Sequence, residues 1–122
     1  MYINRIIRYG GELPQTVRDI ICGHFRDYNR RARLITGAGR KGSQMLQLQR
    51  YNRSVDRAID QAISAHGICG TAAQSVREDL LAVASCGKAQ CANGYGAMYS
   101  PKQYVAIRED ALFFAARELG LV

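Results

Sequence analysis

Apolar residues recur three and four positions apart along most of this chain, the spacing that gathers side chains on one face of an α-helix. The clearest pattern begins at Pro14 and continues to about Ile35, and two further patterns cover residues 44–65 and 72–85. Breaks that contain glycine separate these segments, at residues 10–11, 36–43, 66–70 and 87. We therefore predict an all-α fold with five helices at most.

The same spacing predicts which side chains are buried. In the first helix they are Val17, Ile20, Ile21, His24, Phe25 and Tyr28. In the second they are Leu48, Tyr51, Val55, Ala58, Ile59, Ala62 and Ile63, and in the third Val76, Leu80, Val83 and Ala84. With 48% hydrophobic residues, a chain of 122 residues can bury one core, so we predict a single domain over residues 1–122.

The C-terminal segment, residues 100–120, carries strong signals for one long helix. Ser100 is a good N-cap, Pro101 is well tolerated at the first helical position, and Gln103 can close a capping box. Gly120 supplies the stop signal. The predicted buried positions are Val105, Leu112, Ala115 and Leu119, with Arg108 at their border. We expect about five helical turns here.

Residues 88–96, just upstream, are long enough for a short helix and a glycine turn. Together with the capped terminal helix they form the outline of a helix-turn-helix within residues 71–122. Recognition helices read base edges from their N-terminal turns, so the predicted base-reading residues are Lys102, Gln103, Ala106 and Arg108. Alternatively the helix only closes the bundle, which the acidic Glu109 and Asp110 favour for its middle.

Positive charge is concentrated in the first half of the chain. The net charge of the whole chain is +7, and residues 1–58 contain 12 Lys and Arg against 4 Asp and Glu. This basic half, residues 1–66 in our division, predicts a polyanionic partner, nucleic acid first. A merely solvated surface is the alternative. The predicted phosphate-binding residues are Arg30, Arg31, Arg33, Arg40 and Lys41.

The glycine-rich segment 37–42 matches the pattern G-x-G-x-x-G. That pattern binds dinucleotides only between a strand and a helix, whereas a strong helix is predicted before it here. It is no P-loop either, because Lys41 precedes Gly42 instead of following it. We interpret the segment as a cationic loop that contacts phosphates, with a plain linker as the alternative.

Four residues have side chains that zinc prefers, although their spacing is loose for a zinc site: His66, Cys69, Cys86 and Cys91. We expect free thiols instead, and no metal or other cofactor. His24 lies on an apolar helix face and is interpreted as a core histidine. Because no catalytic set of histidines, nucleophiles and carboxylates is evident, we do not expect an enzyme.

Neither end of the chain nor its middle shows a membrane signal. The longest apolar runs are far below the roughly 20 residues of a membrane span, and arginines interrupt the N-terminus where a secretory signal would be apolar. We therefore expect a cytoplasmic protein that does not enter membranes.

Several helix-period residues resemble those of a known family. The terminal pattern comprises Ser100, Tyr104, Arg108, Ala111, Leu112, Ala115, Leu119 and Gly120, and residues 17–28 and 50–63 match further helices. This set resembles the phage RinA/ArpU transcriptional regulators, which end in a helix-turn-helix similar to the DNA-binding tail domain of sigma factors. The segment between the second and last helices, with its histidine and three cysteines, departs from that family.

The resemblance implies a regulator, encoded by a phage or prophage, that binds double-stranded DNA at late-gene promoters and touches RNA polymerase, with a homodimer as a further expectation. An RNA-binding antitermination factor that uses the arginine-rich segment 26–41 is the first alternative. A phage inhibitor that binds a host protein is the second, although such inhibitors are more often acidic.

Overall fold

The computed structural model describes residues 8–37, 42–86 and 101–122, and within them it is entirely helical apart from turns and short connections. Its five helices are α1 (Gln15–Arg26), α2 (Tyr28–Thr36), α3 (Ser43–Ala65), α4 (Gly70–Cys86) and α5 (Pro101–Glu118). The predicted all-α fold is confirmed. None of the described helices combines the length and the apolar content that crossing a bilayer requires.

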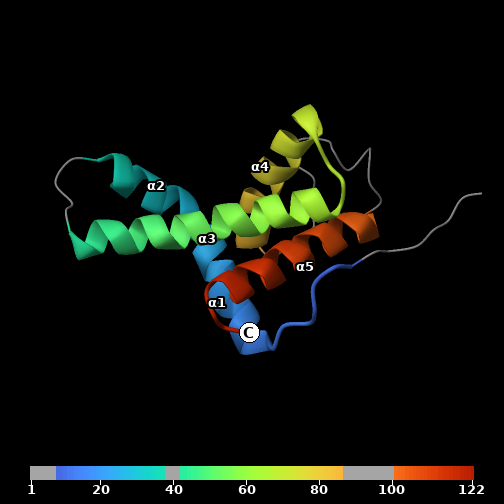
Figure 1. The fold of residues 1–122 in the computed structure, drawn as a ribbon, viewed down its shortest axis with the longest axis horizontal. Coiled ribbons are helices and arrows are strands. Elements are labelled where there is room, and N and C mark those ends of the chain that lie inside the picture. Colours follow the sequence, from blue (N-terminus) through green and yellow to red (C-terminus); the bar gives the residue numbers. More distant parts are fainter. Residues whose placement is uncertain (1–7, 38–41, 87–100) are drawn as a thin grey trace, which may run out of the picture.

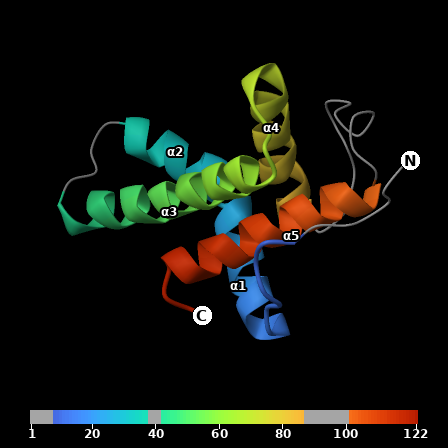
Figure 2. The same cartoon turned by 45° about the vertical axis from the view of Figure 1, so that its right-hand side comes forward.

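Helices α3 and α5 lie side by side and make the most extensive packing between described elements (Figure 1). Helix α1 crosses this pair and also packs against α4. Helix α2 lies along the first half of α3 and does not extend along its second half (Figure 2). Both helices contribute small side chains to the core, since Ala58 and Ala62 of α3 and Ala111 and Ala115 of α5 are completely buried in the same cluster. Small residues where two helices pack let the helix axes approach closely.

The core combines these alanines with larger side chains from four helices. Those that are almost completely buried are Ile21 and Phe25 of α1, Val55 and Ile59 of α3, Val76 and Leu80 of α4, and Ile107 and Leu112 of α5. The predicted buried face of the second helix is therefore confirmed over its second half. In the first helix the prediction for Ile20 is wrong, because this side chain is 49% exposed.

The predicted glycine stop at Gly120 is present, and a second glycine, Gly67, ends α3 within the predicted break at residues 66–70. Gly120 has φ +74°, its N–H donates to the carbonyl of Arg117, and the N–H of Leu121 donates to that of Ala116. This pair of bonds is a Schellman motif, which a residue with a Cβ would strain. Gly67 ends α3 in the same way. The proposed N-cap Ser100 and the short helix predicted over residues 88–96 lie outside the described residues.

The single helix predicted from Pro14 to Ile35 is wrong, because the chain turns at Asp27 and forms α1 and α2 instead. In an unbroken helix the carbonyl of His24 would accept the N–H of Tyr28. Here it accepts a 2.6 Å hydrogen bond from the guanidinium of Arg31. The apolar spacing continues across the turn because α2 also packs one face on α3, so periodicity alone does not reveal the break.

The prediction for α5 is also wrong on its outer face. Ala106 is 3% exposed, and Asp110 is fully buried, although both were expected outside the apolar stripe. Helices α3 and α1 cover two sides of α5, and residues 8–13 cover a third. Gly10 lies so close to Phe113 that an added Cβ would be 2.8 Å from its ring. The Gly10–Gly11 pair therefore lets the N-terminal segment run along α5.

Candidate nucleic-acid interface

Helix α2 and the first half of α3 form a hairpin that extends beyond the packed helices, with residues 38–41 between its two arms (Figure 1). We call residues 26–57 the basic hairpin. This segment contains nine Lys and Arg residues against two Asp and no Glu, so it holds as much net positive charge as the whole chain. A projecting element with this charge is the feature that a polyanion would meet first.

The arginines of each arm lie at helical spacing. Arg26, Arg30 and Arg33 follow one another four and three positions apart at the end of α1 and along α2, and all three are exposed. On α3, Arg50, Arg53 and Arg57 repeat the pattern, three and then four positions apart, and all are exposed. Residues with this spacing share one face of a helix. Each arm thus presents its own row of cations.

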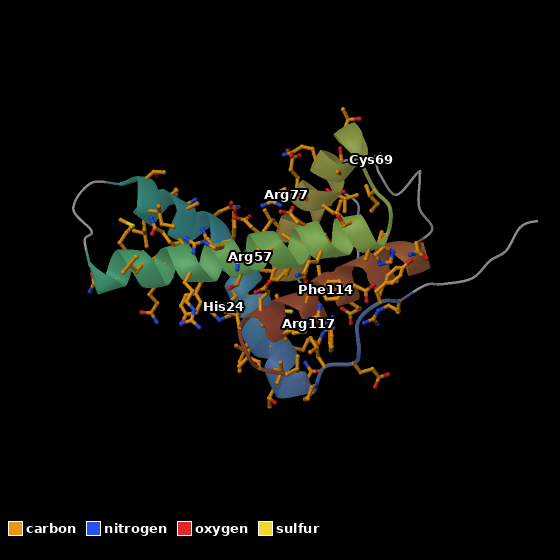
Figure 3. All side chains as sticks on the ribbon, in the orientation of Figure 1. His24, Arg57, Cys69, Arg77, Phe114 and Arg117 are labelled. Atoms are coloured by element: carbon orange, nitrogen blue, oxygen red, sulfur yellow. The ribbon has the colours of Figure 1, made fainter. Side chains whose placement is uncertain are left out.

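Four of these arginines carry no ion pair with another residue that the structure describes. Arg33, Arg50, Arg53 and Arg57 form none with another described residue. Arg30 pairs with Asp27 at 3.4 Å, and both side chains are about half exposed, so this bond is weak. The other acid of the hairpin, Asp56, is already engaged by Tyr28 and by Arg77 of α4. Figure 3 labels Arg57 on α3.

Arg31 has a different role from its neighbours. It is 3% exposed, and its Nε donates a 2.6 Å hydrogen bond to Oδ1 of Asn52 on α3. Asn52 in turn donates to the carbonyl of Tyr28. Burial lowers the pKa of the Arg31 guanidinium, a cost that these bonds offset. Arg31, predicted to bind phosphate, is thus turned inward, where its side chain holds α1, α2 and α3 together.

A groove beside the hairpin brings aromatic and polar side chains together. It is lined by His24, Asp27, Arg30, Arg31, Gln44, Gln47, Leu48 and Tyr51. The rings of His24 and Tyr51 lie 4.6 Å apart, so the predicted core histidine is only partly buried. Burial, and then the positive charge of Arg31, lower the pKa of His24 below its ordinary value. The neutral imidazole is therefore the favoured form at neutral pH.

The loop between the two arms ends in Gly42, the N-cap of α3, where φ is +72°. Only glycine adopts this conformation without strain, so one glycine of the G-x-G-x-x-G match has a structural purpose. The element before the loop is helix α2 and not a strand, which agrees with the interpretation that no dinucleotide fold is present. Arg40 and Lys41 lie outside the described residues.

The base-reading residues predicted on α5 are poorly placed for that role. Ala106 is buried, and Arg108 is 8% exposed with its Nε 3.6 Å from Glu109, so neither side chain is presented to a base edge. Gln103 is half-buried, and its amide nitrogen lies 3.0 Å from Nδ1 of His66. Lys102 belongs to α5, but its side chain is outside the described set. The helix predicted to enter a groove is thus largely internal.

A buried polar network occupies the N-terminal half of α5, and we call it the Asp110 cluster. The carboxylate of Asp110 accepts four hydrogen bonds, from Nε of Arg8, the N–H of Tyr9, the N–H of Gly10 and Nε2 of His66, at 2.6–3.0 Å. Burial alone would raise the pKa of Asp110, but these bonds outweigh it and hold that pKa below its ordinary value. The cluster fixes residues 8–10 and the end of α3 to α5.

The Asp110 cluster also decides how His66 is used. Its Nε2 bonds Asp110, and its Nδ1 accepts from Gln103, so neither ring nitrogen is left for a metal in this arrangement. Cys69 is exposed, whereas the side chains of Cys86 and Cys91 lie outside the described residues. Within the described ranges no group of three or more His, Cys, Asp or Glu side chains is placed to hold a metal ion.

Sequence reasoning missed the second row of arginines, Arg50, Arg53 and Arg57. Their spacing within the helix predicted over residues 44–65, on the face opposite the apolar residues, was the signal that could have found them. It also missed the burial of Arg31, which shares a face with Tyr28 and Ile35 in α2. No comparable signal marks Asp110, because its partners come from distant segments.

Comparison with known proteins returned no match to any family model, curated protein or solved structure.

Proposed function

We propose that the protein binds double-stranded DNA through the basic hairpin. The observation that carries the proposal is the pair of exposed arginine rows, four of whose members form no ion pair with a described residue. Exposed cations without internal partners are free to replace the counterions that surround DNA, which is the main source of affinity for phosphate backbones. The phosphate contacts proposed here are Arg30, Arg33, Arg50, Arg53 and Arg57, with Arg40 and Lys41 of the loop.

The internal bonding of the hairpin supports a binding role. Arg31, Asn52 and the Tyr28–Asp56 hydrogen bond of 2.7 Å connect its two arms. These contacts set the spacing between the two arginine rows before any ligand arrives. A binding surface that is already ordered loses less free energy to the ordering of side chains and backbone when the ligand binds.

Regulation of transcription is the biological role we propose for this binding. The support is the sequence resemblance to phage late-gene regulators, in which DNA binding is coupled to RNA polymerase. A promoter target, contact with RNA polymerase and assembly as a homodimer all belong to this proposal. A reporter gene under a phage late promoter, with and without the protein, tests it.

Salt dependence of binding tests the hairpin directly. Arg57→Gln removes one exposed cation from the hairpin, and Arg117→Gln removes one from α5, where Arg117 lies over the ring of Phe114 (Figure 3). The slope of log affinity against log salt should become shallower by about one unit in Arg57→Gln and stay unchanged in Arg117→Gln. Both are measured by fluorescence anisotropy on a labelled duplex.

Three outcomes would count against the proposal. An equal change in both variants would mean that net charge alone attracts DNA. A flat salt response on every duplex would mean that the arginines do not contact phosphates. Tight binding to a structured RNA, together with weak binding to duplexes, would favour the RNA-binding alternative.

A further inference from the structure

We propose that the outward face of the first turns of α3 reads the bases of duplex DNA, with Leu46, Gln47 and Arg50 as the contacting residues. This inference depends on the proposed function and adds the element that would give it sequence preference. It moves base reading from α5, where sequence reasoning placed it, to the tip of the basic hairpin.

The first evidence is the position of this part of α3. Figures 1 and 2 show that α3 begins at the tip of the hairpin, far from α5, with only α2 beside it. The residues that α2 covers lie on one side, where Asn52 and Leu48 are buried or half-buried. The opposite side, with Leu46 and Arg50, is exposed, and Gln47 is exposed at the border between that side and the groove. One helix with a free outward side fits the major groove of B-form DNA, which is about 12 Å wide.

The second evidence is Leu46, which is 67% exposed. A leucine in this position contributes nothing to the core, and an isolated exposed leucine would by itself need no explanation. Here, however, it lies four positions before Arg50 and seven before Arg53, on the same face as the α3 arginines. An apolar side chain within a row of cations matches the surface of a major groove, where thymine methyl groups lie between phosphate rows.

The third evidence is the hydrogen-bonding chemistry of the two polar residues. Glutamine pairs with the N6 and N7 atoms of adenine, and arginine pairs with O6 and N7 of guanine. Gln47 and Arg50 are three positions apart, so both point to the same side of the helix. The amide of Gln47 now bonds the hydroxyl of Tyr51 at 3.1 Å in an exposed position, and a base edge can replace that partner.

These residues define a short footprint. From position 46 to position 50 the helix rises about 6 Å, which corresponds to roughly two base-pair steps along the DNA axis. Arg53 and Arg57 continue the face for two further turns and would lie against phosphates. We therefore expect a preferred site in which A·T and G·C pairs adjoin. The major groove of A-form RNA is too narrow for a helix, so a duplex RNA of the same sequence should not be read.

Selection from a pool of random DNA duplexes by the full chain gives the preferred sequence, and two variants then test α3 against α5. Gln47→Ala should lose about 10-fold to 100-fold of the affinity for the selected duplex and less than about two-fold for an unselected one. Gln103→Ala, the matched control on α5, should keep the ratio between the two duplexes in the folded fraction. Arg50→Lys keeps the charge and should keep the salt slope, but it should lose the preference for guanine because lysine lacks the two-pronged donor geometry.

The outcomes separate this inference from the proposed function. Salt-dependent binding without any preferred sequence would leave the proposed function in place and overturn the inference. Loss of preference in Gln103→Ala, with none in Gln47→Ala, would return base reading to α5. Absence of binding to every duplex would overturn both. Because all three side chains on α3 are exposed, their variants should melt with the wild type, and the melting curve checks that affinity changes are not losses of fold.

Discussion

The basic hairpin and the Asp110 cluster both contain arginines, but they use these charges in opposite ways. In the hairpin, exposed arginines outnumber the acids, and four of them have no ion-pair partner among the described residues. In the cluster, one buried carboxylate takes hydrogen bonds from Arg8, His66 and two backbone N–H groups. The comparison indicates that a charge paired inside the fold makes its partners costly to remove, and that a charge left unpaired at the surface is available to a partner.

The two regions also differ in the segments of the chain that they connect. Asp110 connects the N-terminal segment, α3 and α5, so its hydrogen bonds to Arg8 and His66 span 102 and 44 positions of sequence. The hairpin is held mainly by contacts between α2 and α3, including those of Arg31 with Asn52 and with the carbonyl of His24. Variants in the two regions should therefore separate stability from binding.

The largest expected effect is on the stability of Asp110→Asn. The amide has one oxygen in place of two, and its NH₂ group would face N–H donors that now lose their acceptor. We expect a loss of about 3–5 kcal/mol in the free energy of unfolding, since removing one partner of a buried charged network leaves the others unpaired. Urea unfolding followed by helical circular dichroism measures it. Arg57→Gln is the control, with a change within about 0.5 kcal/mol. A loss below about 1 kcal/mol in Asp110→Asn would mean that water replaces the missing bonds.

A smaller effect separates two arginines that are only two positions apart. Arg31→Ala leaves Oδ1 of Asn52 and the carbonyl of His24 without their donor, so we expect a loss of about 1.5–3 kcal/mol. Arg33→Ala removes an exposed side chain and should change the free energy of unfolding by less than about 0.5 kcal/mol. In DNA binding the order of the two variants is different. Arg33→Ala removes a phosphate contact while the protein keeps its full stability. Equal stability losses in the two variants would contradict the distinct role of Arg31.

These two arginines show what the sequence could and could not predict. Helix periodicity and capping signals predicted the segments that form α3, α4 and α5, the break at residues 66–70 and the glycine stop at Gly120, because these features depend on residues close together in the chain. Periodicity joined α1 to α2, because the apolar spacing passes through Asp27 unchanged. It treated Arg31 and Arg33 alike, because charge counts do not say which face packs on α3.

The burial of α5 shows a second limit. Ala106 and Asp110 lie outside the apolar stripe of that helix, so periodicity placed them in solvent. They are buried because α1, α3 and residues 8–13 surround the helix. The local sequence pattern does not indicate how many neighbours a helix packs against. For the candidate site, the sequence predicted a basic region and the cationic loop, whereas the arrangement in two rows required the packing of α2 on α3.

The smallest expected effect is a pH dependence that belongs to the hairpin and not to the Asp110 cluster. Burial and the charge of Arg31 lower the pKa of His24 in the folded chain, whereas in the unfolded chain it lies near 6.5. As the pH falls through that value, the unfolded chain takes up a proton at His24 that the folded chain resists, so stability is lost with acidification. The pKa of Asp110 is lowered too, so its contribution is lost as the pH falls from the ordinary pKa of an aspartate towards the depressed one, below the window of His24.

His24→Gln separates the two contributions. Glutamine does not titrate, so the free energy of unfolding of this variant should fall less between pH 7.5 and pH 5.5 than that of the wild type. All other titratable groups are common to both proteins, and the difference between their pH profiles therefore reports His24.

DNA binding gives a second measurement of His24, because phosphates beside the groove would oppose the effect of Arg31 and raise the pKa of His24. Binding should then take up protons near pH 6 in the wild type and not in His24→Gln, which calorimetry in buffers of different ionisation enthalpy detects. Parallel pH profiles for the two proteins would show that neither burial nor Arg31 lowers the pKa of His24 in the folded chain. Equal proton uptake would place the DNA away from this side of the hairpin.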